Sequence, residues 1–171
     1  MRSKSFFILL LLLGFSCSKF DHSSADYYPR WIGDSSFNPE TDSAEFQVCH
    51  GDDNILQYFN LSEGPQYLNE KPALERIYKS SFQPLSGENQ NGMIRIRFVV
   101  NCEGKAGRYR ILQSNFEYEE IEFDERIISQ LLDITKSITA WQIFYKDETP
   151  VDYYLYLIFK IKDGQLIEIL P

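Results

Sequence analysis

Residues 94–112 read IRIRFVVNCEGKAGRYRIL, which is two strand-like runs on either side of a polar turn. The Glu103-Gly104 pair suits a tight hairpin turn, because glycine tolerates the positive φ that such turns require. Counting outward from this pair places Arg97 opposite Arg110. Since side chains alternate between the two faces of a strand, the stretch predicts a hairpin with one apolar face and one cationic face.

Four arginines share the predicted cationic face, and a long C-terminal strand adds two tyrosines to it. The predicted binding residues are Arg95, Arg97, Arg108, Arg110, Tyr154 and Tyr156. The tyrosines join this face if the alternating run at residues 151–162 pairs with the hairpin. Like charges on neighbouring strands repel, so the face needs compensation. Either acids of the same chain fold over it, from the tether, from Asp52 or Asp53, or from residues 117–122, or an external anionic group or an acidic peptide binds there.

Two amphipathic helices flank the hairpin along the chain. Residues 73–82 carry apolar side chains at helical spacing, directly after Pro72, and proline suits the first helical turn. A second apolar stripe of the same period runs from Phe123 to Ile138. The order helix, hairpin, helix, strand predicts an α+β domain with a small antiparallel sheet of three to four strands and two helices on one face.

Residues 1–16 have the pattern of a signal peptide. Arg2 and Lys4 form a basic start, and residues 6–13 are an apolar run. The run is too short for a permanent membrane helix, which needs about 20 apolar residues. The small residues before Cys17 resemble the lipobox of bacterial lipoproteins, which implies that Cys17 becomes a lipid-modified N-terminus. An ordinary secretory signal with an incidental cysteine is the alternative.

This interpretation divides the chain into the signal peptide 1–16, a tether 17–43 and one domain 44–171. The tether is rich in Ser, Asp and Pro, and the domain opens with a short alternating segment at 44–50, which predicts a strand. The expected location is the bacterial cell envelope, on the outer membrane, facing the periplasm or the surface. The formal net charge of −8 opposes binding to nucleic acid or to anionic lipid, so membrane attachment depends on the lipid.

Cys49 and Cys102 remain as a pair once Cys17 is assigned to the lipid. An even pair in an oxidising compartment predicts a disulfide. Such a bridge closes a loop of roughly fifty residues and stabilises by about 4 kcal/mol in the chain-entropy model. Two buried free thiols are the alternative.

The motifs of common enzymes and cofactor sites are not evident. The CHGDD stretch at residues 49–53 lacks the paired spacing of a zinc site and the length of a calcium loop. No nucleophile elbow, P-loop or HExxH stretch occurs. We therefore expect a binding protein without catalysis, cofactor or metal.

The ordered set of elements within residues 72–162 resembles the C-terminal domain of TonB-like proteins. The matching residues are Phe98, Val100, Asn101, Gly104, Lys105, Ile111, Leu112, Trp141, Pro150 and Phe159. The resemblance implies a domain that binds a segment of an outer-membrane receptor as an added strand, with the long last strand as the open edge. It does not extend to the membrane helix and proline-rich spacer of true TonB proteins, and a lipid-anchored chain cannot pull by the route that those two segments provide.

The sequence thus predicts a lipid-anchored envelope protein that binds a protein partner or receptor peptide at a transport or envelope complex. The alternative is a lipoprotein that binds an anionic glycan or small molecule on its Arg/Tyr face.

Overall fold

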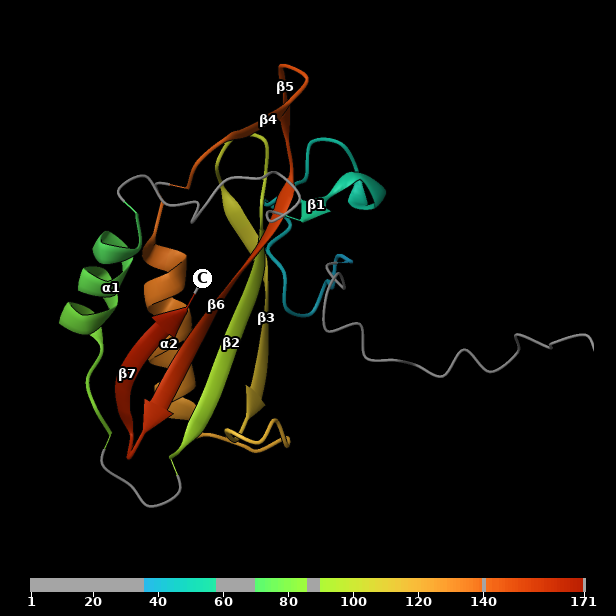
Figure 1. Ribbon diagram of the computed structural model, residues 1–171. Helices are drawn as coiled ribbons and strands as arrows, with labels where there is room; N and C mark the ends of the chain where they lie inside the picture. The colour runs from blue at the N-terminus through green and yellow to red at the C-terminus, as the bar shows by residue number, and fades with distance from the viewer. Residues whose placement is uncertain (1–35, 58–69, 86–89, 140, 171) are drawn as a thin grey trace, which may run out of the picture. The chain divides into compact units, whose positions relative to one another are not determined.

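A computed structural model describes residues 36–57, 70–85, 90–139 and 141–170. The predicted signal peptide, Cys17 and most of the predicted tether lie outside the described residues. The elements follow the order η1, β1, α1, β2, β3, α2, β4 (Phe144–Lys146), β5 (Thr149–Val151), β6, β7 (Figure 1). In the described ranges, no helix combines the length and the apolar content needed to cross a membrane.

Within the described residues, five strands form the main sheet. They are β1 (Leu56–Gln57), β2 (Gly92–Val100), β3 (Ala106–Ser114), β6 (Tyr153–Lys162) and β7 (Gln165–Leu170). β2 pairs antiparallel with β3 on one side and with β6 on the other. The predicted hairpin and the predicted pairing of the long strand with it are therefore confirmed.

The sheet is mixed and has five strands, whereas the sequence predicted an antiparallel sheet of three to four. Leu56 lies beside Tyr153 in a parallel pairing of β1 with β6. β7 returns antiparallel along β6 through a tight turn, in which Asp163 and Gly164 have φ of 51° and 72°. Positive φ at both central residues is the geometry of a two-residue hairpin turn. Because β7 and β1 pair with β6, the expectation that β6 forms the open edge is wrong.

The turn of the β2–β3 hairpin is larger than the predicted Glu103-Gly104 pair. The N–H of Asn101 donates to the carbonyl of Lys105, and the N–H of Gly104 donates to the carbonyl of Asn101, both at 2.8 Å. Cys102 and Glu103 are therefore the central residues, and Gly104 follows them with φ of 76°. A three-residue loop with glycine in this conformation is a common hairpin connection.

One extra residue in β3 compensates for the larger turn. The register shifts between Arg97 and Val99, and Arg108 adopts φ of 55° at this bulge. Arg97 consequently lies opposite Arg110, as predicted, whereas Val99 lies opposite Gly107 and not opposite Arg108. The two faces of the hairpin are therefore those expected, although the pairing next to the turn is not.

Helices α1 (Glu70–Ser81) and α2 (Glu125–Ser137) cover one face of the sheet (Figure 1). The sequence predicted that α1 begins at Pro72, but the helix begins two residues earlier, at Glu70. Pro72 therefore lies within the first turn of the helix, where proline is tolerated. Asp124 precedes α2 and accepts a hydrogen bond from the N–H of Arg126 at 2.9 Å. The centre of the Tyr78 ring lies 4.8 Å from the centre of the Phe159 ring. This contact joins α1 to β6 across the core. The predicted α+β class with two helices is confirmed.

Residues 44–50 do not form the predicted strand. They belong to an irregular segment, residues 36–54, which we call the strap and which ends in the short 3-10 helix η1 (Asp52–Asn54). The backbone N–H groups of Cys49 and His50 donate to the side chain of Asp152. Because these donors bind a carboxylate, they do not enter a strand ladder.

Candidate functional site

The six predicted binding residues lie on the face of the sheet opposite the helices, which we call the arginine face. They are Arg95, Arg97, Arg108, Arg110, Tyr154 and Tyr156. Arg97 lies opposite Arg110 on β3 and opposite Tyr156 on β6, and Tyr154 lies opposite Val99. The guanidinium of Arg95 lies 5.4 Å from the centre of the Tyr118 ring. The structure therefore brings these predicted residues together on one surface.

Part of the arginine face is buried. Arg97 and Arg108 retain only 8% and 7% of their surface exposed, whereas Arg95, Tyr154 and Tyr156 are half-buried. Burying a guanidinium is unfavourable unless it is paired and hydrogen-bonded. The compensating charge has to lie close to these side chains.

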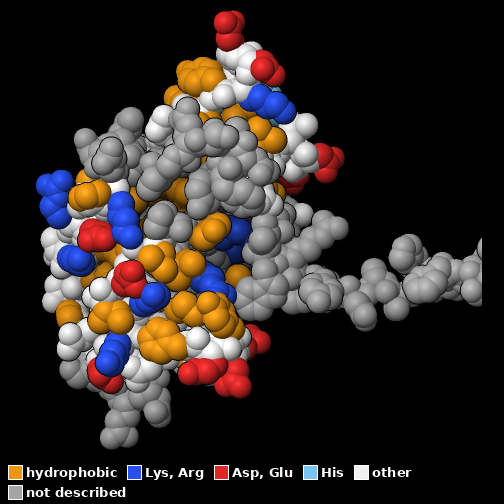
Figure 2. Space-filling view, viewed as in Figure 1, with side chains coloured by type: hydrophobic (Ala, Val, Ile, Leu, Met, Phe, Trp, Pro, Cys, Tyr) orange, Lys and Arg blue, Asp and Glu red, His pale blue; other side chains and the backbone are white. Residues whose placement is uncertain are grey.

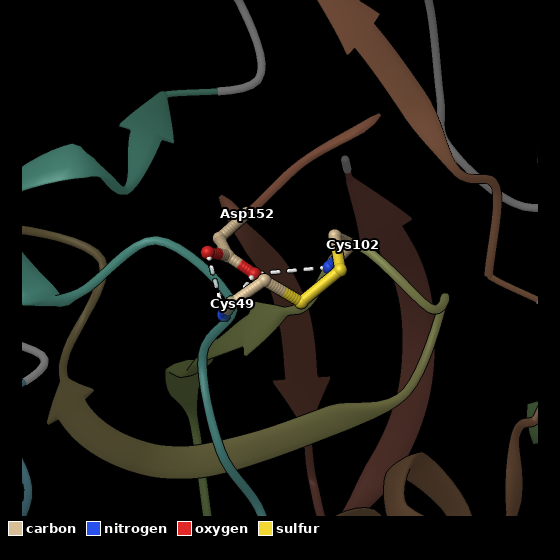
Figure 3. Close-up of side chains that lie close together, drawn as sticks. All are labelled: Cys49, Cys102 and Asp152. Atoms are coloured by element: carbon tan, nitrogen blue, oxygen red, sulfur yellow. Dashed lines mark hydrogen bonds between the residues drawn. A yellow bond between two sulfur atoms is a disulfide. The ribbon is translucent and has the colours of Figure 1, made fainter. Parts of the chain in front are cut away.

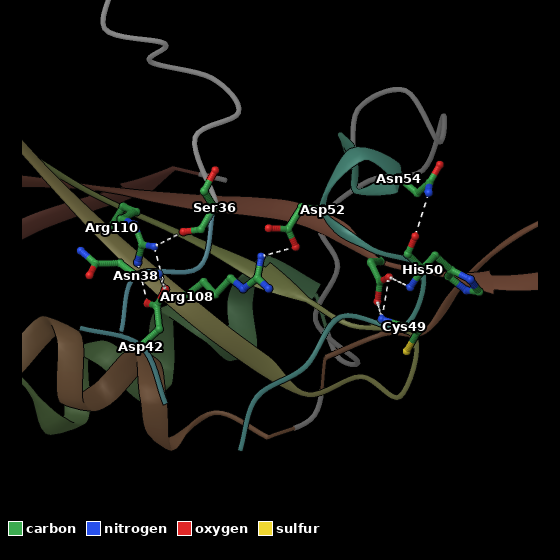
Figure 4. A network of polar contacts seen from close by, with 10 residues as sticks. Ser36, Asn38, Asp42, Cys49, His50, Asp52, Asn54, Arg108 and Arg110 are labelled. Atoms are coloured by element: carbon green, nitrogen blue, oxygen red, sulfur yellow. Dashed lines mark hydrogen bonds and ion pairs between the residues drawn. The ribbon is translucent and has the colours of Figure 1, made fainter. Parts of the chain in front are cut away.

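Two strap carboxylates bind Arg108 and Arg110 of this face (Figure 4). Asp42 accepts hydrogen bonds from both terminal nitrogens of Arg110, at 2.7 and 2.8 Å, and Arg110 also donates to the carbonyl of Ser36 at 2.8 Å. Asp52 accepts from Nη1 of Arg108 at 2.8 Å. Of the two explanations that the sequence left open, acids of the same chain therefore occupy this face.

The two ion pairs differ in their environment. The side chain of Asp42 is 1% exposed, while that of Asp52 is 45% exposed. Hydrogen bonds from Arg110 hold the pKa of Asp42 below its usual value, although burial acts in the opposite direction. Two-point contacts between guanidinium and carboxylate are among the stronger hydrogen-bonded pairs, and exposed pairs are weak. The Asp42–Arg110 pair is thus the main electrostatic contact of the strap.

Asp152 joins the strap to the hairpin turn (Figure 3). This fully buried residue lies between β5 (Thr149–Val151) and β6. Its carboxylate accepts from the N–H groups of Cys49, His50 and Cys102, each at 2.9 Å, and from that of Cys49 again at 3.1 Å. A carboxylate that receives several N–H donors is well compensated for its burial. Asp152 therefore orients the backbone on both sides of the nearby disulfide.

The predicted disulfide between Cys49 and Cys102 is confirmed, and it spans 53 residues of sequence. The two sulfur atoms and the Asp152 carboxylate lie close together, as the ligands of a metal would. Because the sulfurs are bonded to each other, they are not thiolates, which are the form of cysteine that binds metals. His50 and Asp52, from the same CHGDD stretch, contact Pro150 and Arg108 instead.

Two further contacts hold the middle of the strap against the hairpin. The side-chain amide of Asn101 donates to the carbonyl of Gln47 at 3.0 Å, and its oxygen accepts from the N–H groups of Glu103 and Lys105. The ring of Phe46 packs on Gly107 so closely that a Cβ atom at that position would overlap it. Asn101 and Gly107 thus shape the surface that the strap follows.

A cavity of about 480 Å³ lies where the strap meets the hairpin of β4 (Phe144–Lys146) and β5. It is lined by His50, Asn54, Leu56, Lys146, Asp147, Thr149 and Val151. The ring nitrogen Nε2 of His50 lies 2.8 Å from the carbonyl of Pro150. The charged residues of this lining are exposed, so the cavity lacks the buried polar anchors that define a small-molecule site.

The outer side of β7 is a second candidate surface. Among the described strands, β7 pairs with β6 alone. Ile167 is 49% exposed, and Glu168 forms an ion pair with Lys160 of β6 at 2.6 Å. Figure 2 shows basic, acidic and apolar side chains side by side on the face that carries α1 and β7. β3, at the other end of the sheet, is bridged to Glu120 at Ser114.

No family model, no curated protein and no solved structure matches this chain. Its functional interpretation therefore depends on the residues and contacts described above.

Sequence reasoning missed two residues of this region, Asp42 and Asp152. For Asp152, the available signal is an acid at the beginning of the alternating run at residues 151–162. Asp42 was counted in the tether, and nothing local distinguishes it from Asp34 or Glu40. Its partner lies 68 residues away, which local patterns do not reveal.

Proposed function

We propose that this protein is a lipid-anchored protein of the bacterial cell envelope that binds an extended segment of a partner protein by strand addition. The observation that carries the proposal is the outer side of β7, which no other described strand pairs with. An edge strand offers backbone N–H and C=O groups to an incoming strand, and nearby side chains select its sequence. Ile167 provides an exposed apolar contact at this edge.

The TonB-like resemblance supports the same mode of binding. Its matching residues have structural roles in the sheet: Asn101 and Gly104 build the hairpin turn, and Trp141 packs its ring 4.9 Å from that of Phe98. In this chain β7 occupies the side of the long strand that the resemblance assigns to the partner. We therefore propose that the partner adds to β7 and not to β6.

The binding experiment uses the full chain in detergent and labelled seven-residue peptides taken from outer-membrane receptors of the same bacterium. We expect a subset of peptides to bind and to slow amide exchange in β7. Ile167→Glu should weaken binding about tenfold or more, because the substitution places a charge at the contact. Leu112→Glu, the matched change on β3, should leave affinity unchanged. The proposal would be contradicted if Ile167→Glu left the affinity for the peptides unchanged, or if no peptide bound.

The anchor has its own test. Wild-type chain expressed with an alkyne-tagged fatty acid should incorporate the tag and sediment with membranes. Cys17→Ser should lose both properties, whereas Ser18→Ala should keep them. Unchanged labelling in Cys17→Ser would contradict the lipid anchor and leave strand addition unaffected.

The alternative function, binding of an anionic glycan or small molecule on the arginine face, requires these arginines to exchange their present partners. Asp42 and Asp52 contact two of them. This alternative therefore depends on whether the strap moves.

A further inference from the structure

The strap is exposed, whereas the side chains beneath it are buried. Most residues from 36 to 54 are exposed, with Phe37 at 43%, although the side chain of Asp42 is itself only 1% exposed. By contrast, Arg97 and Arg108 are buried. Segments with few buried apolar contacts open at lower free energy than the core. The strap therefore depends on polar contacts and on a covalent bond to stay on the sheet.

The strap has the composition of an acidic ligand. Its charged residues are Glu40, Asp42, Glu45, Asp52 and Asp53, and it contains no lysine or arginine. It contacts the arginine face by the means that an acidic peptide would use: two carboxylates on Arg108 and Arg110, and one backbone carbonyl on Arg110. Charge complementarity of this kind selects partners and speeds their encounter.

A single covalent bond links the strap to the hairpin. Cys49 is exposed and Cys102 is half-buried, so a dithiol in solution can reach the bridge. Residues before Cys49 are also held by Arg110, which contacts Asp42 and the carbonyl of Ser36, by the Asn101–Gln47 hydrogen bond and by Phe46 on Gly107. Directly after the strap, Ile55 is buried and Leu56 pairs with Tyr153. These contacts fix the C-terminal end of the strap, so a released strap would pivot about this end.

We propose that the strap is a built-in ligand of the arginine face, and that reduction of the Cys49–Cys102 disulfide lets an acidic segment of a partner protein replace it. The reductant is a dithiol. It transfers two electrons and two protons to the bridge, which leaves two cysteine thiols, and becomes a disulfide itself. The strap stays tethered to the domain through Ile55, but reduction removes its second attachment and lowers its effective concentration over the arginines, so a competing segment can bind. This inference concerns a different surface from β7 and does not depend on strand addition there.

The test compares oxidised and dithiothreitol-reduced full chain in detergent. The probe is a fluorescein-labelled peptide of residues 36–54 in which Cys49 is replaced by serine, and its binding is followed by anisotropy. We expect reduction to tighten binding about tenfold or more, and added salt to weaken it, because the contact is an ion pair near the surface. A probe carrying Asp42→Asn and Asp52→Asn should lose this affinity. Equal affinity in the two redox states would overturn the proposal.

A second experiment leaves the disulfide intact. In Asp42→Asn, amide exchange across residues 36–46 should rise several-fold, while exchange in α2 stays unchanged. Glu40→Gln is the matched control, because it removes the same charge from an exposed side chain of the same segment. Exchange that is equal in the two variants would contradict the role of Asp42 in holding the strap.

A Cys49→Ser, Cys102→Ser chain should keep the far-ultraviolet circular dichroism of wild type and bind the probe as the reduced protein does. If this variant unfolds, or if reduction changes exchange in α2 as much as in the strap, the disulfide stabilises the whole domain. Either result would overturn the release step.

Discussion

The carboxylate of Asp42 accepts two hydrogen bonds from the guanidinium of Arg110, although 68 residues separate the two in the chain. The pair joins a segment without regular structure to the second strand of the hairpin. It lies at the point where a segment that reads as a tether becomes part of the folded domain.

The first prediction concerns the titration of Asp42. Its folded-state pKa is lowered, so it favours the bound strap at pH values above the ordinary aspartate pKa of about 3.9. That contribution is lost as the pH falls through the lower folded-state pKa. Carboxyl carbon NMR should give a midpoint below 3.9 in wild type. In Arg110→Gln the midpoint should rise, since burial then acts without its opposing hydrogen bonds. An unchanged midpoint would contradict the assignment.

The second prediction concerns Asp152. Replacement by asparagine puts an NH₂ group where the carboxylate receives N–H donors from Cys49, His50 and Cys102. Leaving buried donors unsatisfied typically costs about 1–3 kcal/mol per group. We expect Asp152→Asn to lower the free energy of unfolding in urea by about 2–4 kcal/mol. The exposed Asp133→Asn should change it by less than about 0.5 kcal/mol. Similar values for the two variants would show that Asp152 is not a structural centre.

The third prediction concerns the packing of the strap on β3. A Cβ at residue 107 would overlap the ring of Phe46, so Gly107→Ala should destabilise the strap by about 1–3 kcal/mol. Phe46→Ala should relieve this overlap. The double variant should therefore lose less stability than the sum of the single losses, by about 0.5 kcal/mol or more. Additive losses in urea unfolding would mean that these two residues are not in contact.

The fourth prediction concerns a buried hydrogen bond between the helices. The Thr135 hydroxyl donates to the carbonyl of Leu131 at 2.6 Å, so the Tyr78 hydroxyl, 2.8 Å away, donates to Thr135. Thr135→Val leaves this Tyr78 hydroxyl without its acceptor and should cost about 1–3 kcal/mol. Tyr78→Phe should cost about 1 kcal/mol.

The two substitutions together should be less harmful than the sum, because neither then leaves a buried polar group unpaired. Thermal or urea unfolding of the four chains measures the coupling between the two side chains. Zero coupling would show that the two hydroxyls do not interact.

Much of the domain was predictable because its elements are amphipathic. The alternation in β2, β3 and β6 indicated which side chains share a face, and Arg97, Arg110 and Tyr156 lie as expected. The three-residue turn was missed, but the bulge at Arg108 restored the predicted register. Residues 44–50 do not form the predicted strand, because the N–H groups of Cys49 and His50 donate to the distant carboxylate of Asp152.

Local sequence patterns specify two helices, a hairpin and a long strand, and they specify which side chains of each element face the core. These properties repeat every two or about four residues, so neighbouring residues encode them. Three features follow from the folded domain alone: β1 runs parallel to β6, β7 occupies the expected edge, and strap acids cover the arginines. These pairings join segments far apart in the chain, and their geometry exists only once the sheet has formed.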